Sequence, residues 1–181
     1  QRPIRPREIF YELDRDPQFS FPRDIQTEVL NRWFDRRDEA DLVIKLNVGS
    51  GKTVVGLMAL QSSINEGKGP GLYVAPNRQL VEQVCREAKK LGVRTTDNPL
   101  DADYAAGDAI CVITLHKLFN GRSVFGVNDS PSQISIGTVV IDDAHAGIST
   151  LMEQFCIRLR AGEDAYDGIL EIFREDLRKQ N

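Results

Sequence analysis

The chain has 181 residues, enough for one domain with its own core. With 41% hydrophobic and 28% charged residues it has the composition of a soluble globular protein, and no apolar run approaches the ~18 residues of a membrane span. A net charge of −4 argues against a domain held on nucleic acid by bulk positive charge, while leaving room for contact through a few local groups. Widely spaced cysteines without a zinc pattern predict reduced, buried thiols and a cytoplasmic protein (Cys85, Cys111 and Cys156).

The N-terminal residues are rich in arginine, with Arg2, Arg5 and Arg7 close together. Basic residues this near a chain end are typical of a solvated arm, and we expect one over residues 1–20. The first residue is Gln1 rather than Met, which suggests a fragment or a processed chain. Neither a low-complexity linker nor an internal repeat divides the remainder.

From there the chain alternates between helical and strand-like patterns. Residues 24–38 carry an apolar stripe at helical spacing, which predicts an amphipathic helix. The apolar run 41–46 is bounded by polar residues and predicts a buried strand, and residues 53–67 have the length of a helix that ends at a glycine. The pattern then repeats, with a strand over 71–76 and a helix over 78–91.

Two further strands are predicted at 109–114 and 138–143, while 92–108 and 119–136 are predicted loops. The tail from Leu151 to Gln180 has apolar residues at helical spacing and is predicted to be helical. Near-continuous apolar strands separated by helices indicate a mainly parallel sheet covered on both faces. The sequence therefore predicts a doubly wound α/β fold whose polar loops meet at one edge of the sheet.

Between the first predicted strand and the first helix that follows it lies the stretch LNVGSGKT, residues 46–53. Its glycines let the backbone turn tightly and direct N–H groups at phosphate oxygens, and the helix that follows adds a favourable dipole. The pattern therefore predicts a nucleotide-binding loop formed by Gly49, Ser50, Gly51, Lys52 and Thr53.

Two of these side chains have specific expected roles. Lys52 is predicted to reach the β- and γ-phosphates, and the Thr53 hydroxyl to ligate Mg²⁺. The alternative is a chance match in a surface loop, but the position after a strand and before a helix favours a phosphate loop. Leu46 stands where the general pattern has a glycine, which bears on the class of NTPase.

The stretch VVIDDAHAGI, residues 139–148, ends an apolar strand in two acids. A P-loop ATPase needs a carboxylate at the end of a neighbouring strand to hold Mg²⁺, and Asp142 occupies that place. Asp143 stands where a residue that orients or deprotonates the attacking water is expected. The alternative is a solvated corner between strand and loop. The hypothesis assigns catalysis to Lys52, Asp142 and Asp143, and Mg²⁺ binding to Thr53 and Asp142.

These motifs resemble, in type and order, those of the superfamily 2 helicases and translocases, which include the DEAD-box and DEAH-box proteins. The resemblance covers about residues 21–150, with Asn77 in place of a common Thr and Asp143 in place of the family's Glu. It implies a RecA-like ATP-binding core domain over 21–150, with 151–181 as a helical segment of the same domain. The stretches that carry it are PRDIQ (22–26), LNVGSGKT (46–53), APNRQLVEQ (75–83), ITLHKL (113–118) and DDAH (142–145).

The resemblance also implies ATP and Mg²⁺ as cofactors and DNA or RNA as a partner. Gln26 would then recognise adenine, His145 would couple the nucleotide site to another domain, and Arg78 and Thr114 would contact the sugar-phosphate backbone. The simpler interpretations are an exposed polar residue for Gln26, an ordinary polar contact for His145 and a surface arginine for Arg78. The aromatic residues upstream either stack on the base or pack as core (Phe10 and Tyr11).

Some of the family's features are missing from the sequence. A Ser-Ala-Thr motif does not follow the acidic box, where IST at 148–150 is a poor match, and the chain has no room for a second RecA-like domain. We therefore expect the first core domain of a longer ATP-dependent helicase or translocase, with little or no ATP hydrolysis by these residues alone. Two alternatives remain: another P-loop enzyme such as a kinase, and a nucleotide-binding interaction module with decayed hydrolysis.

Overall fold

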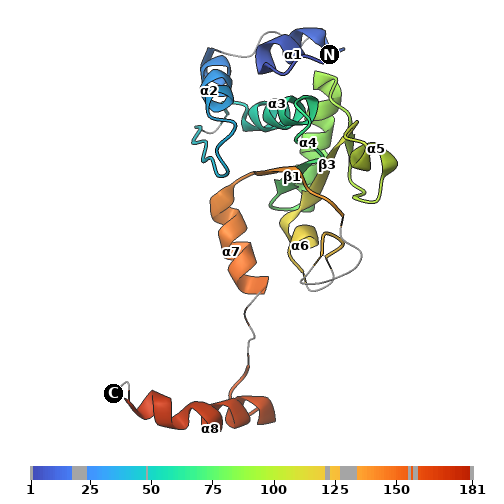
Figure 1. Ribbon diagram of the computed structural model, residues 1–181. Coiled ribbons are helices and arrows are strands. Elements are labelled where there is room, and N and C mark those ends of the chain that lie inside the picture. The colour runs from blue at the N-terminus through green and yellow to red at the C-terminus, as the bar shows by residue number, and fades with distance from the viewer. Residues whose placement is uncertain are drawn as a thin grey trace.

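A computed structural model of the chain describes residues 2–17, 24–47, 49–120, 123–126, 134–154, 156 and 159–179. Within these residues, helices surround a four-stranded sheet with the strand order β2-β3-β1-β4 (Figure 1). Every pairing in the sheet is parallel, which confirms the predicted α/β fold. The strands are β1 (Gly71–Ala75), β2 (Thr95–Thr96), β3 (Ile110–Thr114) and β4 (Thr138–Ile141).

The helices follow the predicted order through the first half of the chain. The expected helices over 24–38, 53–67 and 78–91 correspond to α2, α3 and α4 of the structure. Helix α2 ends earlier than expected, at Asp35. The helices of the described residues are α1 (Pro6–Glu12), α2 (Asp24–Asp35), α3 (Lys52–Asn65), α4 (Arg78–Leu91), α5 (Ala102–Ala105), α6 (Leu115–Leu118), α7 (Ala144–Gln154) and α8 (Asp164–Lys179).

Local sequence sets both ends of α4. The Asn77 side chain accepts a hydrogen bond from the Leu80 N–H at 3.0 Å and so caps the first turn. Gly92 ends the helix in the left-handed conformation, with a φ of 79°. Between these ends the residues at helical spacing are buried (Val81, Val84, Ala88 and Leu91).

The sheet separates two apolar clusters, because successive side chains of a strand point to opposite faces. The face that packs against α1, α2, α3 and α4 carries Tyr73, Ala75, Ile110 and Val112. The opposite face, which Tyr104, Leu115 and Leu151 help to cover, carries Leu72, Val74, Cys111 and Ile113.

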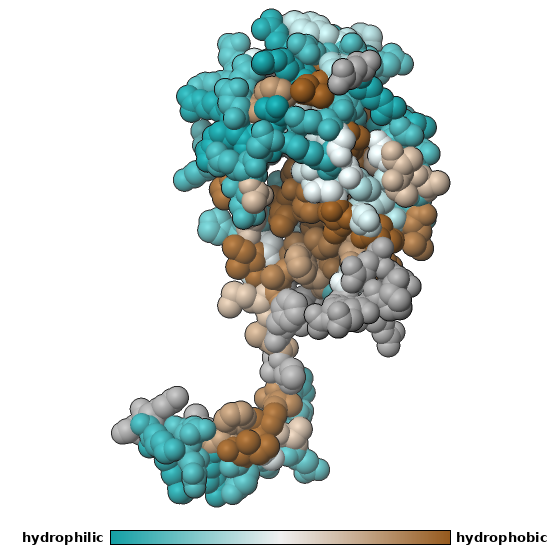
Figure 2. All heavy atoms as spheres, viewed as in Figure 1, coloured by the Kyte–Doolittle hydropathy of each residue, from teal (hydrophilic) through white to brown (hydrophobic). Residues whose placement is uncertain are grey.

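β4 lies at the edge of the sheet and is covered on one face only. Val140 packs against the cluster under α3, whereas Val139 and Ile141 point to the other face and are 41% and 46% exposed. Ile148 and Met152 of α7 are exposed as well. Figure 2 shows hydrophobic residues gathered at the surface in the region of β4 and α7.

The predicted strand over 41–46 is not formed. Residues 41–47 have no regular structure, Val43 is 95% exposed, and β4 pairs with β1 alone. An apolar run becomes a strand only where a neighbouring strand satisfies its backbone N–H and C=O groups, and the sequence pattern does not show whether one is present. Leu46, near the end of this largely exposed run, still packs against the core just before the phosphate loop.

The predicted loop 92–108 contains two short elements, β2 and α5. The Asp101 side chain accepts a hydrogen bond from the Asp103 N–H at 3.0 Å and begins α5 locally, a capping signal that the hydrophobic pattern did not reveal. Parts of the predicted loop 119–136 and of the predicted helical tail lie outside the described residues (121–122, 127–133, 155, 157–158 and 180–181).

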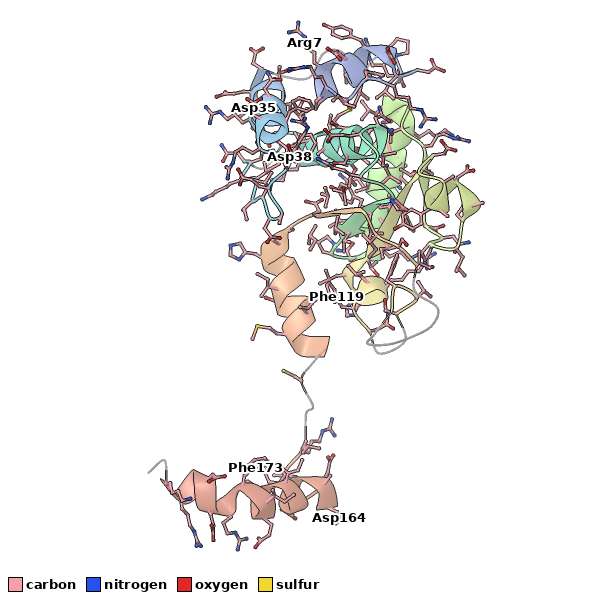
Figure 3. All side chains as sticks on the ribbon, viewed as in Figure 1. Arg7, Asp35, Asp38, Phe119, Asp164 and Phe173 are labelled. Atoms are coloured by element: carbon pink, nitrogen blue, oxygen red, sulfur yellow. The ribbon has the colours of Figure 1, made fainter. Side chains whose placement is uncertain are left out.

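The predicted N-terminal arm carries a packed helix, α1. Ile9 and Phe10 are buried, and the side chains of Ser62 and Asn65 on α3 donate hydrogen bonds to the carbonyls of the segment before α1. The arginines remain exposed, and Figure 3 shows Arg7 on the outer side of α1. The N-terminal helix is therefore part of the folded core.

The C-terminal helix α8 lies apart from the rest of the described chain (Figure 1). All of its described side chains are exposed except Tyr166, which is half-buried. Its apolar residues include Phe173, labelled in Figure 3, at 53% exposure. The predicted helical tail is thus two helices, with the described residues 159–163 non-helical between them.

The cysteines of the described chain are free thiols in three different environments. Burial raises the pKa of Cys111 to about 12, Cys85 is half-buried, and Cys156 is exposed. The prediction of buried thiols is therefore wrong for Cys156. Among the described residues, no helix has the length and apolar character needed to cross a membrane.

Candidate nucleotide-binding site

The phosphate loop occupies the turn that leads into α3. Gly49 and Gly51 both have a φ of 78°, in the left-handed region that favours glycine. Ser50 between them is buried, and its hydroxyl donates a hydrogen bond to the Asn47 carbonyl at 2.6 Å. The two glycines therefore allow the turn that the motif predicts, although Val48 lies outside the described residues.

Gln26 of α2 is buried against this loop. Its Nε2 donates to the carbonyl of Ser50 at 2.9 Å and to that of Gly51 at 3.4 Å. A Cβ on Gly51 would lie 2.0 Å from that nitrogen, so only glycine leaves room for the contact. The Gln26 amide, to which the resemblance assigns the recognition of adenine, thus links α2 to the phosphate loop by hydrogen bonds. Pro22 and Arg23, the first residues of the same motif, lie outside the described residues.

Lys52 and Thr53 begin α3. The N-cap residue Gly51 has no side chain to accept from the first-turn N–H groups, which leaves them as donors for an anion. Lys52 is exposed beside them, and Thr53 is half-buried. Backbone donors, the helix dipole and a lysine therefore converge at one helix start, an arrangement suited to a phosphate chain.

Asp142 lies at the end of β4 and meets the loop through a tyrosine. Its N–H donates to the Val74 carbonyl at 2.9 Å, which continues the pairing of β4 with β1. Its Oδ2 accepts from the hydroxyl of Tyr73 at 3.0 Å, and the Thr53 side chain lies near the same hydroxyl. Burial and the negative charge of Asp142 hold the pKa of Tyr73 far above its usual range, so the hydroxyl keeps its proton.

Asp143 has a different environment from its neighbour. Among the described residues it is the one non-glycine residue in the left-handed region, with a φ of 50°. Its Oδ1 accepts from the Ala146 N–H at 3.3 Å, and its carbonyl accepts from the Gly147 N–H at 2.9 Å. The carboxylate predicted to hold the attacking water therefore caps the first turn of α7.

The two residues expected to contact nucleic acid lie after neighbouring strands. Thr114 ends β3 beside Ala75 of β1, and its hydroxyl accepts from the Lys117 N–H at 3.3 Å, which caps α6. Arg78 begins α4 with a side chain that is 88% exposed and lies 3.7 Å from the Glu82 carboxylate. Because the strands are parallel, both residues lie at the same edge of the sheet as the loop that follows β4.

The remaining candidates lie in contrasting environments. Phe10 is 1% exposed and forms part of the apolar core, whereas Tyr11 is 47% exposed on α1. Burial of Phe10 agrees with core packing rather than with stacking on a base. His145 is exposed in the first turn of α7, and His116, to which no role was assigned, is exposed on α6.

In a comparison with protein-family models, the DEAD/DEAH box helicase model matches residues 23–160 of the chain. The chain belongs to the DEAD/DEAH box helicase family. No curated protein and no solved structure matches the chain significantly. The matched residues include the phosphate loop, the strand ends and Asp142, so the resemblance inferred from the motifs is confirmed, and the chain carries a helicase-type ATP-binding domain.

A DEAD/DEAH box domain implies Mg²⁺, and the oxygen donors of this chain fit that ion. Thr53 and Asp142 present a hydroxyl and a carboxylate that lie near the same Tyr73 hydroxyl. Mg²⁺ is commonly bound by one or two protein oxygens, with water and nucleotide phosphates completing the octahedron. Within the described ranges, no group of three or more His, Cys, Asp or Glu side chains could form a dedicated metal cage. A site shared with the nucleotide therefore fits these residues.

Proposed function

We propose that this DEAD/DEAH box domain binds Mg·ATP on its phosphate loop as one part of a nucleic-acid helicase or translocase. The observation that carries the proposal is that Thr53 at the start of α3 and Asp142 at the end of β4 lie near the same tyrosine hydroxyl. These are the two residues that the motifs assign to the metal. A chance glycine-rich turn would have no reason to lie against the acidic box.

The roles of the site residues follow from their chemistry. The backbone amides of the loop and the first turn of α3 (Gly49, Ser50, Gly51, Lys52 and Thr53) bind the phosphates, and the Lys52 ammonium contributes a mobile positive charge. Thr53 and Asp142 hold Mg²⁺, which neutralises charge on the phosphate oxygens when bound. Catalysis in such a site is positioning and electrostatic stabilisation by fixed groups.

Asp143 limits the rate of hydrolysis in this proposal. Its Oδ1 accepts from the Ala146 N–H, which leaves Oδ2 to hold an attacking water, and the side chain reaches less far than a glutamate. We therefore expect the 181 residues alone to bind nucleotide weakly and to hydrolyse it little. A turnover rate typical of helicases for this chain by itself would contradict that expectation.

Nucleic acid is the second proposed partner. Arg78 and Thr114 are assigned to sugar-phosphate contacts, which position a strand without reading its sequence. His145 is assigned to coupling with a second RecA-like domain, whose arrival on the nucleotide would complete the site. Exposure of Arg78 and His145 leaves both side chains accessible to such partners. DNA and RNA both fit contacts of this kind.

Calorimetric titration with Mg·ATP and Mg·ADP tests the proposal. We expect saturable binding that Lys52→Ala abolishes, because the mutation removes the charge nearest the phosphates. Lys45→Ala is the matched control, since Lys45 is an exposed lysine just before the loop and should leave binding intact. Binding that survives Lys52→Ala, or that Lys45→Ala removes equally, would contradict the proposed site.

A nucleotide-binding interaction module is the second candidate, and the capping role of Asp143 favours it specifically. In that case ATP binding would persist while hydrolysis stays absent. The distinguishing variant is Asp143→Glu, assayed with single-stranded nucleic acid for ATP turnover in the longest form of the protein. ATP turnover by the unmodified protein or by the Asp143→Glu variant supports the helicase-type ATPase. Absence of turnover in both supports the nucleotide-binding interaction module.

A further inference from the structure

Tyr73 is a polar-tipped side chain in the interior of the sheet, and its position depends on a glycine. The residue is 1% exposed, and its ring lies against Gly56 of α3, as does the side chain of Val140 on β4. A Cβ on Gly56 of α3 would lie 2.8 Å from Cε2 of the ring and 3.1 Å from Val140. The glycine in α3 therefore makes the space in which the tyrosine ring lies.

Strand geometry explains why the hydroxyl reaches the acidic box. Tyr73 and Val140 are register partners on β1 and β4, and Asp142 follows Val140 by two residues, so all three side chains share one face. Two residues of strand span about 7 Å, which is close to the reach of a tyrosine lying along the strand direction. A shorter side chain at position 73 would not reach the Asp142 carboxylate.

The chemistry of a phenol hydroxyl determines which partner donates in the hydrogen bond between Tyr73 and Asp142. A tyrosine hydroxyl has a single proton, which it donates here to Asp142 Oδ2 at 3.0 Å. The Thr53 side chain lies near the same hydroxyl.

This direction matters for Asp142, one of the residues assigned to the metal. An Asp142 carboxylate held through Oδ2 has Oδ1 left to accept from metal-bound water. Groups outside the coordination sphere commonly orient the ligands of a metal in this way, and their loss typically lowers metal affinity by about 10- to 100-fold.

We propose that Tyr73 is a positioning residue for the Mg²⁺ site, orienting the Asp142 carboxylate through its hydroxyl group. The inference rests on the proposed function, since it assumes that Mg²⁺ and nucleotide occupy this site. It assigns a role to a residue outside the motifs by which the family was recognised. Gly56 has a supporting role, because it gives the tyrosine its place.

The test measures how much Mg²⁺ strengthens ADP binding, as the ratio of ADP affinity in Mg²⁺ to that in EDTA. Tyr73→Phe keeps the ring and removes only the hydroxyl. We expect this variant to lose about tenfold of the Mg²⁺-linked gain while its ADP affinity in EDTA stays unchanged. In an Asp142→Asn background, Tyr73→Phe should cause no further loss, because the contact it removes acts through Asp142.

Tyr104→Phe is the matched control. Tyr104 is also a fully buried tyrosine, but its hydroxyl donates to the Ser135 carbonyl at 3.1 Å on the opposite face of the sheet. This variant should keep the full Mg²⁺-linked gain, and urea unfolding of all variants shows whether each is folded. An unchanged gain in folded Tyr73→Phe, or equal losses with and without Mg²⁺, would overturn the inference. Absence of ADP binding by the unmodified chain would instead overturn the proposed function.

Discussion

The Gln26 side chain joins α2 to the phosphate loop through the carbonyls of Ser50 and Gly51. The substitution Gln26→Ala removes the buried amide donor, so both carbonyls lose a hydrogen bond. We expect this to lower the free energy of unfolding by about 2 kcal/mol. Because the loop itself loosens, we expect ATP and GTP affinity to fall by similar factors. Urea unfolding and calorimetry with both nucleotides measure these effects.

The control for that substitution is Gln83→Ala on α4, where the glutamine is exposed and donates to the Glu87 carboxylate on the same helix. It should change neither stability nor affinity appreciably. A loss in Gln26→Ala confined to adenine nucleotides would show that the side chain reads the base, and would contradict the tethering account.

Asp143 combines a left-handed backbone with a helix cap, two features that aspartate and asparagine tolerate and alanine does not. We expect Asp143→Ala to lower the free energy of unfolding by about 1 kcal/mol, from the lost cap. Asp143→Asn keeps an oxygen acceptor and should stay close to the unmodified chain. Equal stability of the alanine and asparagine variants in urea unfolding would rule out the capping role.

At the scale of elements, the packing of α3 on β1 depends on Gly56. A glycine in a helix interior is normally replaced by alanine with a gain of about 1 kcal/mol. At position 56 the added methyl meets the Tyr73 ring at 2.8 Å, so we expect Gly56→Ala to cost about 1–3 kcal/mol through overpacking. Thermal or urea unfolding measures the change.

Gly147 of α7 is the matched control for this substitution. It is buried too, but a Cβ there would meet Ile141 and Leu115 at 3.7 and 3.8 Å, which is ordinary contact. Gly147→Ala should therefore be neutral or stabilising. If both variants respond alike, the tight fit between α3 and Tyr73 is not a determinant of stability.

The strands show what the sequence could and could not predict. The runs 71–76 and 109–114 were predicted as strands and form β1 and β3, and 41–46 has a similar apolar pattern without forming a strand. The difference is the presence of a neighbour for hydrogen bonding, a long-range condition that periodicity does not report. The short helix α5 was not predicted because the local signal for it is a single capping side chain, that of Asp101, which periodicity also does not report.

The site divides in the same way. Lys52, Thr53 and Asp142 were predicted because a motif gives their roles at a fixed spacing in the sequence. The contacts of Gln26 with the loop and of Tyr73 with Asp142 were not, because they depend on how α2, α3 and the sheet pack. One signal was available for Tyr73: a tyrosine within a run otherwise typical of a fully buried strand needs a partner for its hydroxyl.

At the scale of the whole molecule, the two terminal helices differ in their importance for stability. α1 buries Ile9 and Phe10 in the core, whereas no described side chain of α8 is buried. Deleting residues 160–181 should therefore leave the urea unfolding midpoint nearly unchanged. Deleting residues 1–12 should cost several kcal/mol, at about 1.5–3 kcal/mol for each large apolar side chain exposed.

Each deletion shortens the chain at one end, so the two deletions serve as controls for each other. If removing α8 lowers stability as much as removing α1 does, then α8 contributes to the fold through contacts other than those described. Circular dichroism of the α8 peptide should also show little helix in water, because isolated helices of about 12–15 residues or fewer are marginal and this one is barely longer.

The central claim is that backbone amides of the phosphate loop bind the nucleotide phosphates. The most direct test is to follow backbone amide chemical shifts by nuclear magnetic resonance during titration with Mg·ADP. We predict that the amides of residues 49–53 shift most and saturate together, and that Lys52→Ala abolishes the response. Shifts centred elsewhere, for example on the hollow of about 440 Å³ between α1 and α2, with residues 49–53 unmoved, would contradict the account.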